Sequence, residues 1–405
     1  MIKLAWKNIW RNKTRSSIIL CAIIIGVISG TLFTAFYNGM IYQRIEAAIA
    51  NETSNIQIHS IHYLDNREIT DTISEINKII SIIDTSSVVK SYAERIKIPA
   101  MINSANNNTG IMLIGVNKEQ EKTTTQLWKK VVEGEFLPEN KTNSIFIGKK
   151  LAEKLKIKLK SKVVLTFQDL NGQLVSGAFR VYGIYYSGNS FFDERMVYAH
   201  QSTISNLIGS SGKKVIHEIA ISTIDDNLTY QYSENLKKKI ISADIKTWKD
   251  IYPEVGMLAD YTKYLQLIYM TIIYLALSFG IINTMLMAVM ERTREIGMLM
   301  AIGMNKTRIF FMINLETILI MTTGTIVGLG FSYLLNEILG QTGINLTAFA
   351  QGLNQMGFDA IIYPVLTMRE YLHTMILVLI AGFLSSLIPA RKALKLSPAE
   401  AIRKL

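Results

Sequence analysis

The chain has 405 residues, of which 49% are hydrophobic and 19% are charged, and its mean hydropathy is +0.24. It is too apolar for an average soluble protein and too charged to lie wholly within a membrane, so we expect a few spans and a sizeable water-soluble domain. The one cysteine, Cys21, excludes a disulfide framework and a cysteine-based metal site. A net charge of +11 is compatible with nucleic-acid binding, but the distribution of the basic residues around apolar runs argues against it.

Residues 1–15 predict a basic amphipathic helix at a membrane surface. Its cations recur at every fourth position and its indole side chains suit the headgroup region; the residues are Lys3, Lys7 and Arg11, opposite Trp6, Ile9 and Trp10. An apolar run from 16 to 37 follows at once. A cleavable signal peptide is the alternative, but the run is 22 residues long and no small-residue cleavage site closes it. We therefore expect an uncleaved first span.

Four long apolar runs occur, and about 20 such residues cross a bilayer core. They predict transmembrane helices at 16–40, 264–290, 309–336 and 371–388. Lys and Arg gather in 1–15, in 291–308 and in the tail 389–405, whereas 337–368 has none. Because positive segments stay in the cytoplasm, we expect both termini and 291–308 to be cytoplasmic, and 41–263 and the loop 337–370 to lie outside. Pro389 is expected to end the last span, and Ser397-Pro398-Ala-Glu400 to open a short helix.

The segment 41–263 predicts a mixed α/β domain, with two βα-type units around a β-rich middle at roughly 100–210. A capping box at Thr72–Glu75 is expected to open a helix with Ile73, Ile76, Ile80 and Ile83 on one face. The expected strands are 56–58, 94–102, 110–116, 163–167, 179–186, 197–199 and 218–222, and the other expected helices are 147–155, 202–208 and 230–241. Asn171-Gly172 predicts the turn of a hairpin.

Between the second and third spans, 291–308 predicts a short helix lying on the membrane surface. A charged turn over 291–295 is followed by apolar residues at helical spacing, namely Ile296, Leu299, Met300 and Ile302. An ordinary solvated loop is the alternative, although such a loop is usually shorter, polar and rich in turn residues.

The run Glu291-Arg-Thr-Arg-Glu-Ile-Gly, followed by Ala301-Ile-Gly303, resembles the cytoplasmic signature of the MacB/FtsX superfamily of ABC transporter permeases. Trp6–Lys13 and the tail motifs at 389–394 and 398–403 are similar to that superfamily too. The resemblance implies a protein of the bacterial inner membrane whose coupling helix docks on a separate ABC ATPase, and which pairs with a second permease copy or paralogue. It assigns ATPase coupling to Glu291, Arg292, Arg294, Glu295, Ile296, Gly297, Leu299, Met300 and Gly303.

Three stretches of the α/β segment, 147–152, 181–188 and 192–198, look like the lipoprotein-releasing (LolC/LolE) branch of this superfamily. That resemblance implies mechanical extraction of lipoproteins by ATP hydrolysis in another subunit, with a lipoprotein cargo and a periplasmic carrier. The segment 166–179 departs from the branch because it is short and has no proline-bearing hook on which a carrier chaperone docks. The alternatives are a MacB-like efflux permease for peptides or drugs and an FtsX-like regulator that transports nothing.

Three residues within the spans are singled out. Gly26 and Gly30 have the four-residue spacing that allows close helix contact in lipid, and we expect lipid-linked cargo to enter beside them. Glu316 is the one ionisable residue in the body of a span; we expect it to pair with Arg308 or Arg292, with transport coupling as the alternative. Because no other charge interrupts the spans, the sequence offers no evident polar pathway for a hydrophilic solute.

No catalytic constellation emerges from the sequence. Gly209-Ser-Ser-Gly-Lys-Lys lacks the spacing of a phosphate-binding P-loop. His59 and His62 have neither cysteines nor paired carboxylates near them, so we expect no metal. We expect no cofactor and no enzymatic activity in this chain, and a membrane-anchored enzyme is therefore a poor alternative.

Overall fold

The computed structural model describes residues 2–210 and 212–394, and it forms two compact units. The helical unit comprises Met1–Met40, Tyr261–Asn345 and Ile361–Leu405, and the α/β domain comprises Ile41–Asp260 and Leu346–Ala360. The short helix expected to open at Ser397 lies outside the described residues.

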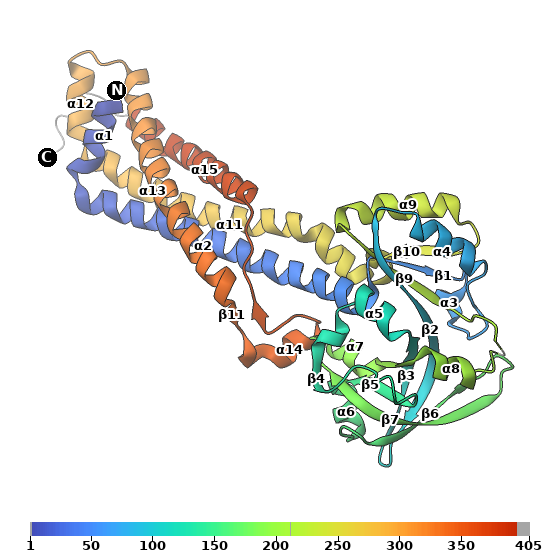
Figure 1. Ribbon diagram of the computed structural model, residues 1–405. Helices are drawn as coiled ribbons and strands as arrows, with labels where there is room; N and C mark the ends of the chain where they lie inside the picture. Colours follow the sequence, from blue (N-terminus) through green and yellow to red (C-terminus); the bar gives the residue numbers. More distant parts are fainter. Residues whose placement is uncertain (1, 211, 395–405) are drawn as a thin grey trace. The chain divides into compact units, whose positions relative to one another are not determined.

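Within the part of the chain that the structure describes, four helices are long and apolar enough to cross a membrane. They are α2 (Lys13–Ala47), α11 (Pro253–Glu291), α13 (Lys306–Thr342) and α15 (Met368–Leu394), and Figure 1 shows them as the long ribbons of the helical unit. The expectation that Pro389 ends the last helix is wrong, because α15 continues through it to Leu394. Membrane helices tolerate an internal proline where neighbouring helices and serine side chains compensate for the lost backbone hydrogen bond.

Glycines bring α2 close to its neighbours in the helical unit. A Cβ atom at Gly324 would lie 2.8 Å from Ile23, and one at Gly328 would lie 3.0 Å from Val27, so α13 meets α2 where it has no side chains. Ile23 and Val27 are fully buried in the core of this unit. The branched side chains of α2 thus pack against small residues of α13. Such close packing stabilises helix contacts in lipid, where the hydrophobic effect does not drive helices together.

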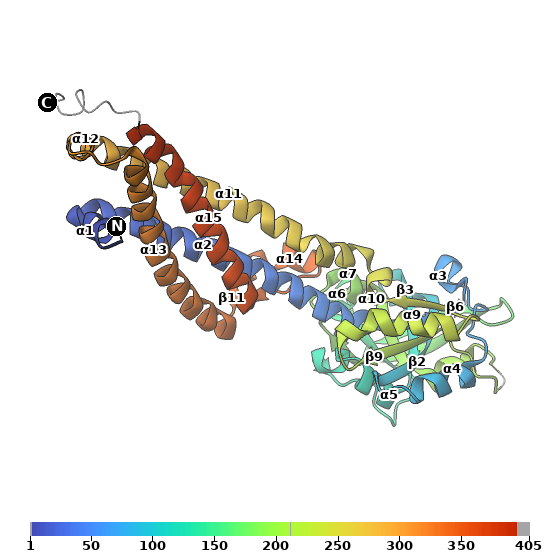
Figure 2. The ribbon, with the colours of Figure 1, turned by 90° about the horizontal axis from the view of Figure 1, so that it is seen from above.

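Two short helices lie at one end of the helical unit, where Figures 1 and 2 both place them near each other. They are α1 (Ile2–Arg11) and α12 (Thr293–Ala301). A two-stranded sheet of β11 (Ile344–Asn345) and β12 (Ile361–Ile362) also belongs to this unit.

The core of the α/β domain is a closed ring of six strands. Hydrogen-bonded pairs run β2–β3–β8–β5–β7–β6 and back to β2, which makes a small barrel. The strands are β2 (Val89–Asn103), β3 (Asn108–Val116), β5 (Ser144–Gly148), β6 (Lys162–Gln168), β7 (Leu174–Tyr185) and β8 (Met196–His200). Alternate residues of these strands fill the interior with apolar side chains, as a barrel of this size needs. The β6–β7 hairpin turns at Gly172, whose φ of 78° suits glycine, and this confirms the predicted turn.

The longer β2 continues out of the barrel into a second layer, in the order β10–β1–β9–β2. Two helices, α4 and α9, cover this layer with isoleucines and Leu236 (Figure 1). The elements are β1 (Ile56–His59), β9 (Glu218–Thr223), β10 (Asp244–Thr247), α4 (Ile76–Asp84) and α9 (Thr229–Lys239).

Two local predictions in this domain are wrong. The capping box at Thr72–Glu75 does not form, because the Ile73 amide donates to the Ile216 carbonyl and α4 begins only at Ile76. Its buried face uses Ile79 rather than Ile80. The helix expected from Ile147 begins at Lys149, since Ile147 is a strand residue paired with Ile184.

Shorter elements complete the α/β domain. They are the π-helix η1 (Ala48–Thr53), α3 (Tyr63–Asn66), α5 (Lys118–Thr124), η2 (Leu127–Lys130), β4 (Val131–Gly134), α6 (Lys149–Leu155), α7 (Ser190–Arg195), α8 (Gln201–Leu207), η3 (Asp226–Leu228), α10 (Trp248–Ile251), η4 (Thr347–Phe349) and α14 (Ala350–Gln355). The segment 346–360, which connects α13 to α15, packs through α14 against α7.

Candidate coupling site

The helix α12 is set off from its neighbours at both ends. Arg292 interrupts the regular helix between α11 and α12 with φ −99° and ψ 14°. At the other end Gly303 adopts φ +99°, its amide donates to the Met300 carbonyl, and the Met304 amide donates to the Leu299 carbonyl. This pair of bonds is the Schellman arrangement, in which glycine accepts a backbone conformation that side chains disfavour. Gly303 therefore ends α12.

Ion pairs join α12 to the N-terminal segment. Arg11 donates to Glu295, and Arg15 pairs with Glu291 at 2.6 Å. The two cations are four residues apart and so are the two carboxylates, but Arg11 ends α1 and Arg15 lies in α2, whereas Glu291 ends α11 and Glu295 lies in α12. The hydrogen bond from Arg11 lowers the pKa of the Glu295 carboxyl, since it stabilises the ionised form.

A second set of contacts joins α12 to α13. The Arg292 guanidinium lies 3.1 Å from a carboxylate oxygen of Glu316 and 3.1 Å from one of Glu295. The Asn8 amide of α1 donates to Glu316 at 2.6 Å. Glu316 is only 7% exposed, and Arg292 is the partner that the sequence analysis named beside Arg308. The ion pair thus satisfies a carboxylate that would be costly to bury alone.

The two faces of α12 differ from the expectation. Thr293, Ile296 and Gly297 are buried within the helical unit, and Ile296 belongs to its core. Met298 and Ile302 are 47% and 85% exposed, and Arg294 is exposed beside them. Ile296, which was assigned to ATPase coupling, therefore packs within its own chain and holds α12 in place. Leu299 and Met300 are half-buried. The exposed apolar side chains are those of Met298 and Ile302.

The glycines singled out on α2 face α11. A Cβ atom at Gly26 would lie 2.1 Å from the Leu277 side chain, and one at Gly30 would lie 3.2 Å from the Tyr274 hydroxyl. The first and second long helices are therefore in close contact at both positions.

The interior of the helical unit is more polar than the sequence suggested. The Thr31 and Ser332 hydroxyls lie 2.5 Å apart, and Asn336 donates to Ser332 and to Tyr371. Further along, Asn314 bonds to the Ser386 hydroxyl. These uncharged side chains bring α2, α13 and α15 together.

The α/β domain has its own buried charge cluster, centred on Arg95. Its guanidinium lies 2.7 Å from Glu121 and 2.7 Å from Glu218, and Glu218 also accepts from Lys97 at 2.7 Å. Burial opposes ionisation of Glu218, but Lys97 and Arg95 lower its pKa to about 2. Burial lowers the pKa of His59 to about 4 despite the nearby Glu218. The cluster ties β2 to β9 and α5, and its charges are all compensated.

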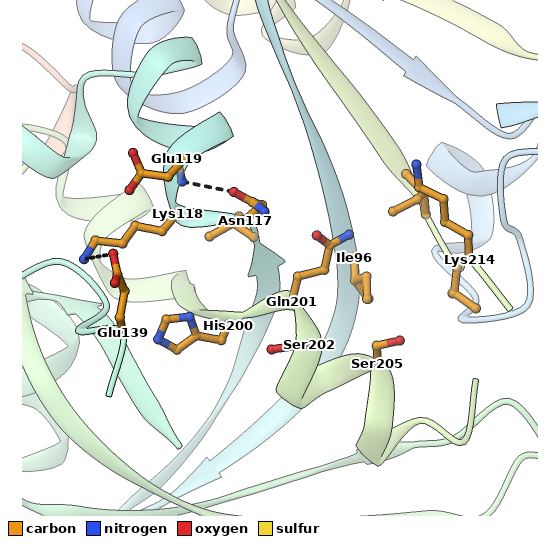
Figure 3. Close-up of a pocket in the computed structure, with 13 residues that line it drawn as sticks. Ile96, Asn117, Lys118, Glu119, Glu139, His200, Gln201, Ser202, Ser205 and Lys214 are labelled. Carbon is orange, nitrogen blue, oxygen red and sulfur yellow. Dashed lines mark hydrogen bonds and ion pairs between the residues drawn. The ribbon is translucent and has the colours of Figure 1, made fainter. Parts of the chain in front are cut away.

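His59 and one surface hollow bring polar side chains of the α/β domain together. His59 contacts the His217 carbonyl and the Gln57 side chain, and no group of three metal-binding side chains occurs among the described residues. Figure 3 shows a hollow of about 490 Å³ where β3 and β8 end. There Asn117 accepts from the Glu119 amide and Lys118 lies 3.8 Å from Glu139.

The sequence did not predict three contact residues around α12, namely Asn8, which bonds to α13, Arg11, which pairs with α12, and Arg15, which pairs with the end of α11. The basic residues of the N-terminal segment were interpreted as partners of lipid headgroups only. The matched four-residue spacing of Arg11 and Arg15 with Glu291 and Glu295 was the signal that could have found them.

Comparisons with known proteins give two family matches. Residues 16–239 match the MacB-like periplasmic core domain, and residues 267–398 match the FtsX-like permease C-terminal family. The first match alone covers more than half of the chain.

Among curated relatives, the pyoverdine export ATP-binding/permease protein PvdT of Pseudomonas entomophila is 25% identical over 99% of this chain and 59% of PvdT. The macrolide export ATP-binding/permease protein MacB of Photorhabdus laumondii is 32% identical over 31% of this chain and 17% of MacB. The chain thus spans less than two thirds of the length of these relatives. The crystal structure of the periplasmic region of MacB from Actinobacillus actinomycetemcomitans covers 53% of this chain and 97% of that chain, with a TM-score of 0.35 and 14% identity.

Proposed function

This chain belongs to the MacB/FtsX family of ABC transporter permeases, and from that premise we propose that it is the permease subunit of an exporter driven by a separate ABC ATPase. The relatives PvdT and MacB are described as ATP-binding/permease proteins, and this chain aligns with only part of them. The 405 residues contain no P-loop sequence, so the proposal places ATP hydrolysis on another chain.

The exposed side of α12 is the observation that carries the proposal. The apolar side chains of Met298 and Ile302 are exposed near Arg294, on and directly after the short helix α12. The opposite side of α12 is buried in the helical unit. Apolar anchors surrounded by polar groups are what a protein interface uses for most of its binding energy. ATP binding closes the ATPase, α12 moves with it, and the contacts of Arg292 and of Arg11 pass the motion to α13 and α1.

A second permease copy or a paralogue completes the transporter in this proposal, because the family's members pair. The cytoplasmic position of α12 and of both termini follows from the excess of Lys and Arg in those segments. The α/β domain then lies on the periplasmic side, where its counterparts in the family lie.

Export of a small molecule or peptide is better supported than release of lipoproteins. The named relatives export pyoverdine and macrolides, and none of them is of the lipoprotein-releasing branch. The argument for a lipid-linked cargo relied on spans without charges other than Glu316, and it did not consider the uncharged polar side chains of Thr31, Ser332 and Asn336, which meet inside the helical unit.

The docking claim is tested with Ile302→Asp, using Ile241→Asp as the matched control. Both isoleucines are 85% exposed, but Ile241 follows α9 in the α/β domain. We expect the tagged wild-type chain and the Ile241→Asp chain to co-purify from native membranes with an ABC ATPase and its ATP hydrolysis. Ile302→Asp should lose both, because an unpaired charge in a dry interface costs several kcal/mol. Retention of a fully active ATPase by Ile302→Asp would overturn the assignment of α12.

A further inference from the structure

An apolar strip lies on the outside of the barrel in the α/β domain. Met101 of β2 pairs with Gly110 of β3, Pro99 pairs with Met112, and Met112 pairs in turn with Met196 of β8. The barrel interior takes the alternate residues, so these side chains point outward together. Gly110 has no side chain opposite Met101, which keeps the surface beside it open. The three methionines of the strip have unbranched thioether side chains, which adapt to apolar partners of varied shape.

Walls rise around this strip on several sides. They come from α3 with the loop after it, the β6–β7 hairpin, and α7, and together with the strip they enclose a hollow of about 1330 Å³. Typical small-molecule sites measure roughly 300–1,000 Å³. Met101 is 44% exposed and Phe191, on the α7 wall, is 56% exposed. Exposed apolar surface gathered in one hollow of a water-facing domain is a mark of a binding site.

The charges around the hollow favour an anion. Of its three lining carboxylates, Glu194 is bound by Lys154, Asp169 accepts the amides of Asn171 and Gln173 in its own hairpin, and Glu68 is exposed next to Arg67 in the chain. Two lining guanidinium groups, those of Arg67 and Arg195, form no ion pair among the residues that the structure describes. Arg195 instead lies 4.2 Å above the Phe191 ring, so a cation and an aromatic face stand together at the rim.

We propose that this hollow binds the exported molecule in transit, and that the molecule is an amphipathic anion with a large apolar body. The body lies on Met101, Met112 and Met196, and its acidic group meets Arg195. Arginine suits this role because its planar donors match a carboxylate. The proposal rests on the export function proposed above, from which it takes only the existence of a cargo.

The test is photo-cross-linking of the full-length chain in membrane vesicles with a benzophenone-bearing fatty acid and, in parallel, with its methyl ester. We expect both probes to label peptides of β2, β3 and α7. Met101→Asp should reduce labelling by about tenfold, since the loss of one buried apolar contact has that order of effect on binding. Ile224→Asp is the control, because Ile224 is an exposed residue of the same domain away from the hollow, and it should label as the wild type does.

Arg195→Gln separates the two parts of the proposal. It should weaken labelling by the acid and leave labelling by the ester unchanged. Equal effects on both probes would contradict the anion, and labelling that is indifferent to Met101→Asp, or that falls outside the hollow, would overturn the site. Phe191→Ser serves as a second variant should Met101→Asp fail to fold. Ile302→Asp should label normally, so loss of the ATPase interaction and loss of this site are distinguishable.

Discussion

The two units each bury an arginine between carboxylates, but the surroundings of the two arginines differ. Arg95 in the α/β domain is 2% exposed and joins strands and a helix of one rigid sheet. Arg292 in the helical unit is 15% exposed and sits at the irregular turn between two helices, with Glu295 on one side and Glu316 on the other. The first cluster stabilises a fixed fold, whereas the second connects three separate segments at a joint. The same residue types thus join the parts of one sheet in the first case and, in the second, three segments around the helix that we propose as the coupling site.

Removal of the Arg95 guanidinium should have the largest effect on stability. Arg95→Met leaves Glu121 buried without its guanidinium partner and Glu218 with Lys97 as its remaining lysine or arginine partner, which costs about 3–5 kcal/mol. The measurement is urea-dependent protease cleavage within 41–260 of the full chain. Lys237→Met is the control, because Lys237 pairs with Glu234 on the exposed surface and such a pair contributes about 0–1 kcal/mol. Equal effects of the two substitutions would remove the distinction between the clusters.

Protonation of His59 should lower the free energy of unfolding of the α/β domain, and this is the second largest expected effect. The folded pKa of His59 is about 4, below its unfolded value of 6.5, so the unfolded chain binds a proton in this window that the folded chain does not. Glu218, with a folded pKa of about 2 against 4.5, acts in the same direction at lower pH. The contribution of His59 to stability should therefore fall by ~2–3 kcal/mol as the pH drops from 6.5 to 4, while Asp193, whose pKa burial raises to about 7, acts in the opposite direction over the same range. The measurement is the difference in unfolding free energy between the wild type and His59→Asn, which should change by that amount between pH 6.5 and 4 because Asp193 and the buried His217 are common to both chains. A difference that does not depend on pH would contradict the burial of a neutral His59.

The smallest expected change in stability comes from the joint in the helical unit. Arg292→Met leaves Glu316 with Asn8 alone, and the partial exposure of the site limits the loss to roughly 1–3 kcal/mol. The functional loss should be larger than the structural one, because α12 is then no longer tied to α13. Thermal unfolding of the detergent-solubilised chain and ATP-driven export give the two readouts.

The double variant Arg292→Met with Glu316→Met sharpens that result. It removes the charge that the single change leaves unpaired, so thermal stability should recover while export stays impaired. Recovery of both would mean that the ion pair has a structural role only.

The sequence was sufficient for features that local patterns determine. The apolar runs predicted all four long helices, and Asn171-Gly172 predicted the β6–β7 hairpin. The sequence did not predict features that depend on contacts between distant segments. Glu75 adopts a left-handed conformation ahead of α4, because the backbone before it is already bonded to Ile216. A capping motif cannot compete with such a tertiary hydrogen bond.

The same reason explains the errors at α12. The apolar spacing of Ile296, Leu299 and Met300 predicted a helix correctly, but a helix with apolar residues on more than one side does not reveal which side its own chain covers. The structure places Ile296 inside and Ile302 outside. The residues of the hollow in the α/β domain were equally hidden, since Met101, Met112 and Met196 become neighbours only through strand register.

The claim that α12 and the α/β domain serve opposite sides of one membrane is tested most directly by cysteine labelling. Cys21→Ser removes the single native cysteine, and Ile302→Cys or Asn171→Cys then adds one exposed cysteine to either unit. With a membrane-impermeant maleimide added to spheroplasts, Asn171→Cys should react at once, and Ile302→Cys should react only after the membrane is permeabilised. Labelling of Ile302→Cys in intact spheroplasts would contradict the coupling role of α12 and the arrangement of the spans together.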